Sequence, residues 1–297
     1  MTRRGKRGKC RDMSRILGHL RLYDGRESPP RPAAPPDPHL LANRELIRPA
    51  GYNRGHHRLE PFSPEWFAEL EEKRYARHGR WLERALEISK HPGEPILLIH
   101  PGLGSDAIRF LKHGTEVTLG IADGDDPHPI RQNLARLGFS APVVPIPTEQ
   151  LPFVDGAFDI VVLNGLYETP DLPNLADELF RVLKCGGKVI GLFPAHFDAG
   201  YWQDLILPLQ HLYWRRPADP TTAPKTTAKD LRLAFHRFSE NKVFKRHLRR
   251  SELPHLCRLM PLVALERVFG RVLVIKARKP ISAARVLPMT FSDAVAA

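Results

Sequence analysis

The stretch from residue 151 to residue 190 constrains the fold of this chain more than any other part. It reads LPFVDGAFDIVVLNGLYETPDLPNLADELFRVLKCGGKVI. The run FDIVVL at 158–163 is rich in β-branched residues, which is typical of a strand buried on both faces. The run LADELFRVL at 175–183 repeats apolar residues at helical spacing, and the glycines of CGG at 185–187 suit the end of a helix. The pattern therefore predicts a strand, a loop, a helix, a glycine turn and a second strand.

The alternation of strand and helix extends back along the chain. Short apolar runs at 95–99, 116–121 and 143–147 predict three earlier strands, and the intervening segments predict helices at 106–113 and 129–137. Strands that alternate with helices form a parallel sheet with helices on both faces. Such sheets bind ligands at the carboxyl ends of their strands, so a site is expected there.

The flanking segments complete the expected domain. A helical region is predicted at 63–88, where Ser63 is a plausible N-cap before a proline. After an aromatic-rich insertion, the sequence predicts a strand at 242–247, a helix at 254–268 and a strand at 271–277.

Together these segments resemble the class I S-adenosylmethionine-dependent methyltransferase family, in its small-molecule branch. That family has an LPF, a turn with Asp or Gly, an FD that opens the fourth strand, and an RVL-x-x-GG before the fifth, as 151–190 has here. The resemblance covers roughly residues 60–280. It implies an enzyme with a Rossmann-like α/β fold, whose mostly parallel seven-stranded sheet ends in an antiparallel last strand.

The resemblance also implies a site for S-adenosylmethionine after the first strand. The stretch LLIHPGLGSDAIRFLKHG lies without a gap against the family form LEIGCGTGTDLLxFAxxG. Two glycines of this loop match, and glycine lets the backbone approach a ligand without a Cβ clash. The positions carried over as cofactor-binding are His100, Gly102, Leu103, Gly104, Asp123, Glu149, Gln150, Leu151 and Asn164.

Three acids that hold the cofactor in the family are replaced in this chain. Their positions are occupied by Leu98, Ile121 and Pro147. Each replacement removes a charge-assisted hydrogen bond of about 1.5–3 kcal/mol. Asp123 lies two residues beyond the ribose-binding position and reaches the ribose only if the strand end shifts. Two hypotheses follow: a methyltransferase of an unidentified small molecule, or a catalytically inactive relative that serves as a binding or scaffold module, with a polyanion as one candidate partner.

Candidate catalytic residues lie after the fourth and fifth predicted strands. Methyl transfer needs mainly an acceptor positioned in line with the methyl group, and a general base helps when the acceptor is a hydroxyl. Glu168 and His196 are the candidate bases; a helix-capping acid and a structural histidine are the alternative interpretations. The sequence shows no metal-ligand spacing, so no metal site is expected.

Charge is distributed unevenly along the chain. The formal net charge is +12, and residues 215–280 carry 17 Lys and Arg against 5 acids, whereas residues 61–214 carry 13 against 21. A polyanion such as nucleic acid is one interpretation of the basic C-terminal third. A solvated basic surface is favoured, because no aromatic-interleaved nucleic-acid signature accompanies the charge.

Composition also predicts the domain organisation and the compartment. We expect a disordered, basic and proline-rich leader at 1–50, a methyltransferase-like domain at 60–280 and a tail at 281–297. No apolar run is long enough to cross a bilayer, and no secretory signal is recognised, which indicates a cytoplasmic protein. Three widely spaced cysteines fit a reducing compartment. The sequence carries no signal for an oligomeric state.

Overall fold

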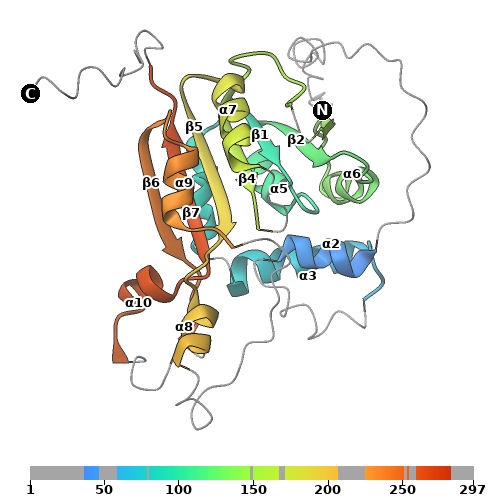
Figure 1. Ribbon diagram of the computed structural model, residues 1–297. Coiled ribbons are helices and arrows are strands. Elements are labelled where there is room, and N and C mark those ends of the chain that lie inside the picture. The colour runs from blue at the N-terminus through green and yellow to red at the C-terminus, as the bar shows by residue number, and fades with distance from the viewer. Residues whose placement is uncertain are drawn as a thin grey trace, which may run out of the picture.

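A seven-stranded sheet forms the centre of the protein (Figure 1). The computed structural model describes residues 37–46, 59–78, 80–147, 150–166, 171–206, 225–250, 253 and 259–281. The strands are β1 Pro95–Ile99, β2 Glu116–Ala122, β3 Val143–Ile146, β4 Phe158–Asn164, β5 Leu183–Pro194, β6 Ser239–Arg246 and β7 Val272–Arg278. Their order is β3-β2-β1-β4-β5-β7-β6, and β7 runs antiparallel to both of its neighbours. The predicted mostly parallel sheet with an antiparallel last strand is confirmed.

Helices cover both faces of this sheet. They are α2 Pro38–Glu45, α3 Pro64–Glu72, the π-helical turn η3 Lys73–His78, α4 Leu82–Leu86, the short 3-10 turn η4 Ile88–Lys90, α5 Ser105–Lys112, α6 His128–Ala135, α7 Leu172–Val182, α8 Ala199–Ile206, α9 Ala228–Ala234 and α10 Leu262–Phe269. In the part of the chain that the structure describes, no helix is long and apolar enough to span a membrane. The helix predicted from residue 254 begins at Leu262 as α10, and residues 254–258 lie outside the described residues.

Alternate residues of the central strands face the two helical layers. Ile96 and Leu98 of β1 belong to the core that contains residues of α4, α5 and α6. Leu97 and Ile99 belong to the opposite core, with residues of α7 and α9. All four side chains are buried. Because β1 pairs with β2 on one side and β4 on the other, it needs apolar residues on both faces, as its sequence PILLI provides.

The predicted N-cap of α3 is confirmed, and this helix packs on a helix that we did not expect. The Ser63 hydroxyl accepts a hydrogen bond from the Trp66 N–H at 3.2 Å. Within the leader predicted to be disordered, residues 38–45 form α2 instead. Ala42 and Leu46 are fully buried in one cluster with Trp66, which supplies the apolar surface that orders this short helix. Helix α2 lies beside α3 (Figure 1).

The glycine turn predicted after α7 lies within a strand. The helix ends at Val182 and β5 begins at Leu183, whose backbone is already extended. Gly186 has φ of 79° where the pairing of β5 with β4 is irregular. A Cβ on Gly187 would lie 2.9 Å from the backbone oxygen of Asp159. These glycines therefore permit a close strand approach rather than ending a helix.

Glu87 attaches the helices before β1 to the sheet. Its carboxylate accepts hydrogen bonds from Lys188 on β5 and Lys276 on β7, both at 2.6 Å. Burial alone would raise the pKa of Glu87, but the hydrogen bonds and charges of the two ammonium groups outweigh burial and lower the pKa to about 2. This carboxylate is therefore ionised and cross-links two strands to the segment between α4 and η4.

Candidate functional site

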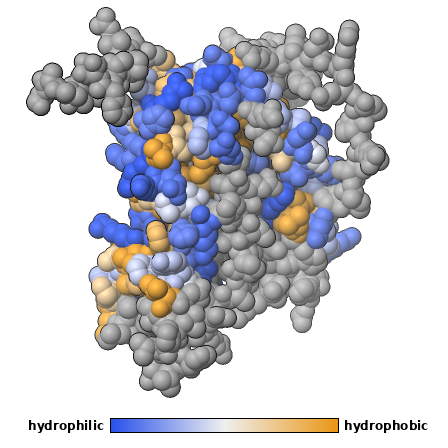
Figure 2. Space-filling view, viewed as in Figure 1, coloured by the Kyte–Doolittle hydropathy of each residue, from blue (hydrophilic) through white to orange (hydrophobic). Residues whose placement is uncertain are grey.

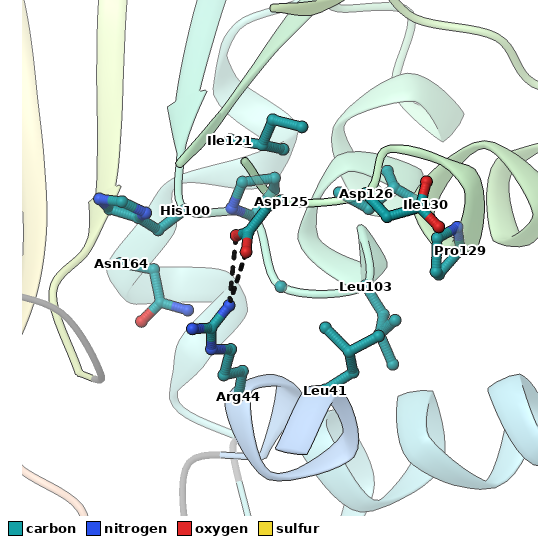
Figure 3. A pocket seen from close by; sticks show the side chains of 12 residues that line it. Leu41, Arg44, His100, Leu103, Ile121, Asp125, Asp126, Pro129, Ile130 and Asn164 are labelled. Atoms are coloured by element: carbon teal, nitrogen blue, oxygen red, sulfur yellow. Dashed lines mark hydrogen bonds and ion pairs between the residues drawn. The ribbon is translucent and has the colours of Figure 1, made fainter. Parts of the chain in front are cut away.

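A pocket lies beside the loop that connects β1 to α5 (Figure 3). The ends of the parallel strands β1, β2 and β4 contribute to it, which is the place where open α/β sheets bind ligands. Its walls come from the glycine loop (His100 to Leu103), the end of β2 and the turn after it (Ile121, Asp125, Asp126), the start of α6 (Pro129, Ile130), the end of β4 (Asn164) and α2 (Leu41, Arg44). The pocket volume is about 70 Å³.

The glycine loop owes its shape to left-handed backbone conformations. Gly102 has φ of 60° and Gly104 φ of 86°, values that glycine adopts without steric cost. Gly104 directly precedes α5, so the first N–H groups of this helix, which have no partner within the helix, face the loop. His100, at the family's first glycine position, also has a positive φ, of 53°, and its N–H donates to the Gly120 carbonyl at 2.9 Å. His100 thus adopts the left-handed backbone conformation of this turn, although it stands at a position where the family has glycine.

The carboxylate of Glu45, at the end of α2, accepts hydrogen bonds from two N–H groups at this loop. The Leu103 N–H donates to Glu45 Oε2 at 2.6 Å, and the Ser105 N–H donates to Glu45 Oε1 at 3.3 Å. The start of a helix favours such an anion, because its amides carry partial positive charge. Burial raises the pKa of Glu45, and the nearby Arg74 offsets part of that increase. Sequence reasoning missed Glu45, since it lies in a proline-rich leader predicted to be disordered.

A buried network behind the loop holds α2 in place. The Arg74 guanidinium donates to the Asp106 carboxylate from Nε at 2.6 Å and from Nη2 at 2.5 Å. Its Nη1 donates to the backbone carbonyl of Glu45. The Tyr75 hydroxyl donates to Asp106 at 2.6 Å. Burial alone would lower the pKa of Arg74, but Asp106 and Glu45 raise it above its ordinary value, so the guanidinium stays charged. The network joins α2, η3 and α5.

Acids of the turn after β2 line the pocket, but not the one predicted. Ile121, at the family's ribose-acid position, is buried and lines the pocket. Asp125 and Asp126 also line it, whereas Asp123 is exposed and is not among the lining residues. Asp125 forms an ion pair with Arg44 of α2, whose Nη1 lies 3.2 Å from Asp125 Oδ2 (Figure 3).

Of the remaining residues predicted to bind the cofactor, only some line the pocket. Asn164, at the end of β4, is buried and lines the pocket. Leu151 is buried away from it, and its N–H donates to Glu178 at 2.9 Å. Gln150 is exposed. Glu149 lies outside the described residues, so its predicted contact with adenine stays a prediction.

Of the two candidate bases, the structure describes only His196, and it lies outside the pocket wall. His196 is exposed after β5, and its ring lies 4.8 Å from that of Phe197 and 5.6 Å from that of Tyr201. It is not among the residues that line the pocket. Glu168 lies outside the described residues. In the described ranges, no three His, Cys, Asp or Glu side chains are grouped so as to hold a metal ion.

Exposed apolar side chains gather at the opposite end of the molecule from α6, around α10 (Figure 2). They are Leu259, Met260, Val263 and Val268. Hydrophilic residues dominate the rest of the described surface in this view (Figure 2).

Comparisons with known proteins find similarity to methyltransferases. A family profile described as "Methyltransferase domain" matches residues 109–191. The demethylmenaquinone methyltransferase of Lactococcus lactis subsp. lactis is 47% identical over 47 residues, or 16% of this chain and 19% of that protein. The chain thus matches about a fifth of the length of this curated relative. Among solved structures, a SAM-dependent methyltransferase from Methanosarcina mazei has 19% identity and a TM-score of 0.47, with 66% of this chain and 97% of that chain covered. One from Aquifex aeolicus has 12% identity and a TM-score of 0.47, with 73% and 98% covered.

The sheet order and the glycine loop define a Rossmann-like α/β protein with a ligand pocket at the carboxyl ends of its strands. The profile match and the curated relative narrow this class. Residues 109–191 match a methyltransferase domain, and 47 residues of the chain are similar to a curated methyltransferase. The resemblance drawn from residues 151–190 is therefore confirmed.

Proposed function

We propose that this chain is an S-adenosylmethionine-dependent methyltransferase that acts on a small molecule. The observation that carries the proposal is the glycine loop, whose left-handed residues open a pocket at the end of β1 within a methyltransferase topology. The curated relative is named for the methylation of demethylmenaquinone, which supports a small-molecule acceptor. Its match covers 19% of that protein, so we carry over the class of reaction and not the acceptor.

The polar groups of the pocket fit the parts of this cofactor. The N–H groups of Leu103, in the pocket wall, and of Ser105 next to it would suit the cofactor carboxylate once Glu45 releases them. The carboxylates of Asp125 and Asp126 would suit the ribose hydroxyls. Asn164, at the end of β4, lines the pocket and supplies a side-chain amide for hydrogen bonding. When bound, S-adenosylmethionine supplies the activated methyl group. The protein residues hold and orient it, which is most of what methyl transfer requires.

The cofactor fits the pocket only if side chains of α2 leave it. The pocket holds about 70 Å³ with Leu41 and Arg44 in its wall, whereas ligand pockets are typically about 300–1,000 Å³. Displacing these two side chains enlarges the pocket on the side that α2 closes, while the strand ends and the glycine loop stay in place.

A second candidate function is a non-catalytic binding module that keeps the fold. The occupation of the loop N–H groups by Glu45 favours it, as do the apolar or proline residues at the three acidic positions. Under this proposal α2 is a permanent part of the site, and the partner is bound elsewhere on the surface.

Calorimetric titration with S-adenosylmethionine and S-adenosylhomocysteine tests the two proposals. We expect micromolar dissociation constants if the site is functional. Asn164→Ala should weaken binding about 2- to 10-fold through the loss of one hydrogen bond. Asn174→Ala is the matched control, because that side chain is exposed on α7 and bonds to Asp171. Absence of binding at millimolar ligand would refute the enzyme and favour the binding module.

A further inference from the structure

We infer that helix α2 is a built-in competitor of the cofactor: the Glu45 carboxylate occupies the anion position of the glycine loop, and cofactor binding must displace it. This inference rests on the proposed function. The inference also goes beyond the proposed function, because it assigns to α2, upstream of the methyltransferase core, a direct effect on cofactor affinity.

The contacts of Glu45 place it where an incoming anion would bind. Its two carboxylate oxygens accept the N–H groups of Leu103 and Ser105, at 2.6 Å and 3.3 Å. A Cβ built on Gly102 would lie 2.5 Å from Glu45 Oε2, so the carboxylate fills the close-approach space that this glycine provides. Glu45 is 1% exposed. A ligand carboxylate cannot take the same donors while Glu45 holds them, and two carboxylates in one buried place repel each other.

A second contact closes the pocket on its outer side. Arg44, the neighbour of Glu45, lies in the pocket wall and pairs with Asp125 on the turn after β2 (Figure 3). Consecutive residues of α2 thus hold the glycine loop on one side and the turn after β2 on the other. Asp125 is one of the acids assigned above to the ribose, so its pairing with Arg44 also competes with the cofactor.

The attachment of α2 allows its side chains to leave without loss of the whole helix. Arg74 donates to the backbone carbonyl of Glu45, not to its carboxylate. Ala42 and Leu46 are packed against Trp66 and Phe67 of α3. Neither contact is made by the Glu45 side chain, although the charge of Arg74 also attracts the Glu45 carboxylate. The helix can therefore stay anchored at its end while Glu45 and Arg44 change position.

The opposite role for Glu45 makes an opposite prediction. The family's acid in the first strand is replaced by Leu98, which is buried and faces the core. If Glu45 replaced that acid and bound the ammonium group of the cofactor, its removal would weaken binding. If it competes, its removal strengthens binding. The sign of the change decides between the two roles.

The test is a calorimetric titration of the full chain with S-adenosylhomocysteine in wild type, Glu45→Gln and Arg44→Ala. We expect both variants to bind about 10-fold tighter or more, because the apparent affinity of a closed site is reduced by the fraction that is open. Glu116→Gln, an exposed acid at the start of β2, is the control and should bind as wild type does. If Glu45→Gln impairs folding because Glu45 is buried, Arg44→Ala still tests the inference, since Arg44 is not fully buried.

Hydrogen exchange of residues 37–46 gives a second readout. In wild type, protection of this segment should stay unchanged or fall when S-adenosylhomocysteine is added, because α2 gains no contact with the ligand, and a rise in protection would overturn the inference. Weaker binding by Glu45→Gln would also overturn it and assign Glu45 as a cofactor ligand. Equal binding by all variants would refute the competition and leave the proposed function intact. Absence of binding in every variant would refute both.

Discussion

Replacing Asp106 with alanine should destabilise the protein by about 3–5 kcal/mol, the cost typical of removing one partner from a buried ion pair. Asp106 is 4% exposed and Arg74 is 1% exposed. The carboxylate accepts two hydrogen bonds from the guanidinium and one from the Tyr75 hydroxyl. Without it, the guanidinium remains buried and cannot lose its proton, because its pKa lies far above neutrality.

Urea unfolding followed by far-ultraviolet circular dichroism at pH 7 measures this loss. Asp177→Ala is the matched control. Asp177 pairs with Arg237 at 2.7 Å, but the two side chains are 59% and 48% exposed, so its removal should cost about 0–1 kcal/mol. The double variant Asp106→Leu with Arg74→Met should recover much of the loss, because no unpaired charge remains. A loss for Asp106→Ala no larger than the control would refute the buried network.

Three further predictions concern stability. The Glu87 carboxylate, whose pKa is lowered from 4.5 to about 2, stabilises the fold above pH 4.5 and loses this effect as the pH falls to about 2. Glu87→Gln should therefore abolish this part of the decline in stability, which urea unfolding between pH 4.5 and 2 measures. Asn133→Ala should cost about 1–3 kcal/mol, since the buried amide donates to the Leu103 carbonyl at 2.8 Å. Gly187→Ala should cost about 1–3 kcal/mol, because its Cβ would lie 2.9 Å from the Asp159 oxygen.

Each of these predictions has a contradicting outcome. An unchanged pH dependence in Glu87→Gln would show that another carboxyl group governs acid stability. A loss for Asn133→Ala equal to that of Gln132→Ala, an exposed neighbour on α6 that bonds to the Phe62 carbonyl, would remove the special role of the buried amide. Wild-type stability of Gly187→Ala would mean that β5 shifts away from β4 without cost.

Local patterns determined most of the sheet. Runs such as PILLI and FDIVVL are apolar at nearly all consecutive positions and rich in β-branched residues, which is typical of a strand covered on both faces. The N-cap at Ser63 and the left-handed glycines Gly102 and Gly104 were also predictable, because hydroxyl capping and positive φ depend on residue type and near neighbours. The end of α7 was not predictable from the sequence. The close approach of β5 to β4, and not the end of the helix, requires glycine at positions 186 and 187.

The sequence by itself determined the fold, the glycine loop and its place after the first strand, since these follow from periodicity and from residues close together in the chain. Only the tertiary structure decided what surrounds that loop. Glu45 meets Leu103 across 58 residues, and Arg44 meets Asp125 across 81. No local pattern encodes such a pairing, because it depends on how α2 packs on α3 and on how the strands align. The acids that line the pocket were likewise fixed by the path of the turn after β2, which carries Asp125 rather than Asp123 into its wall.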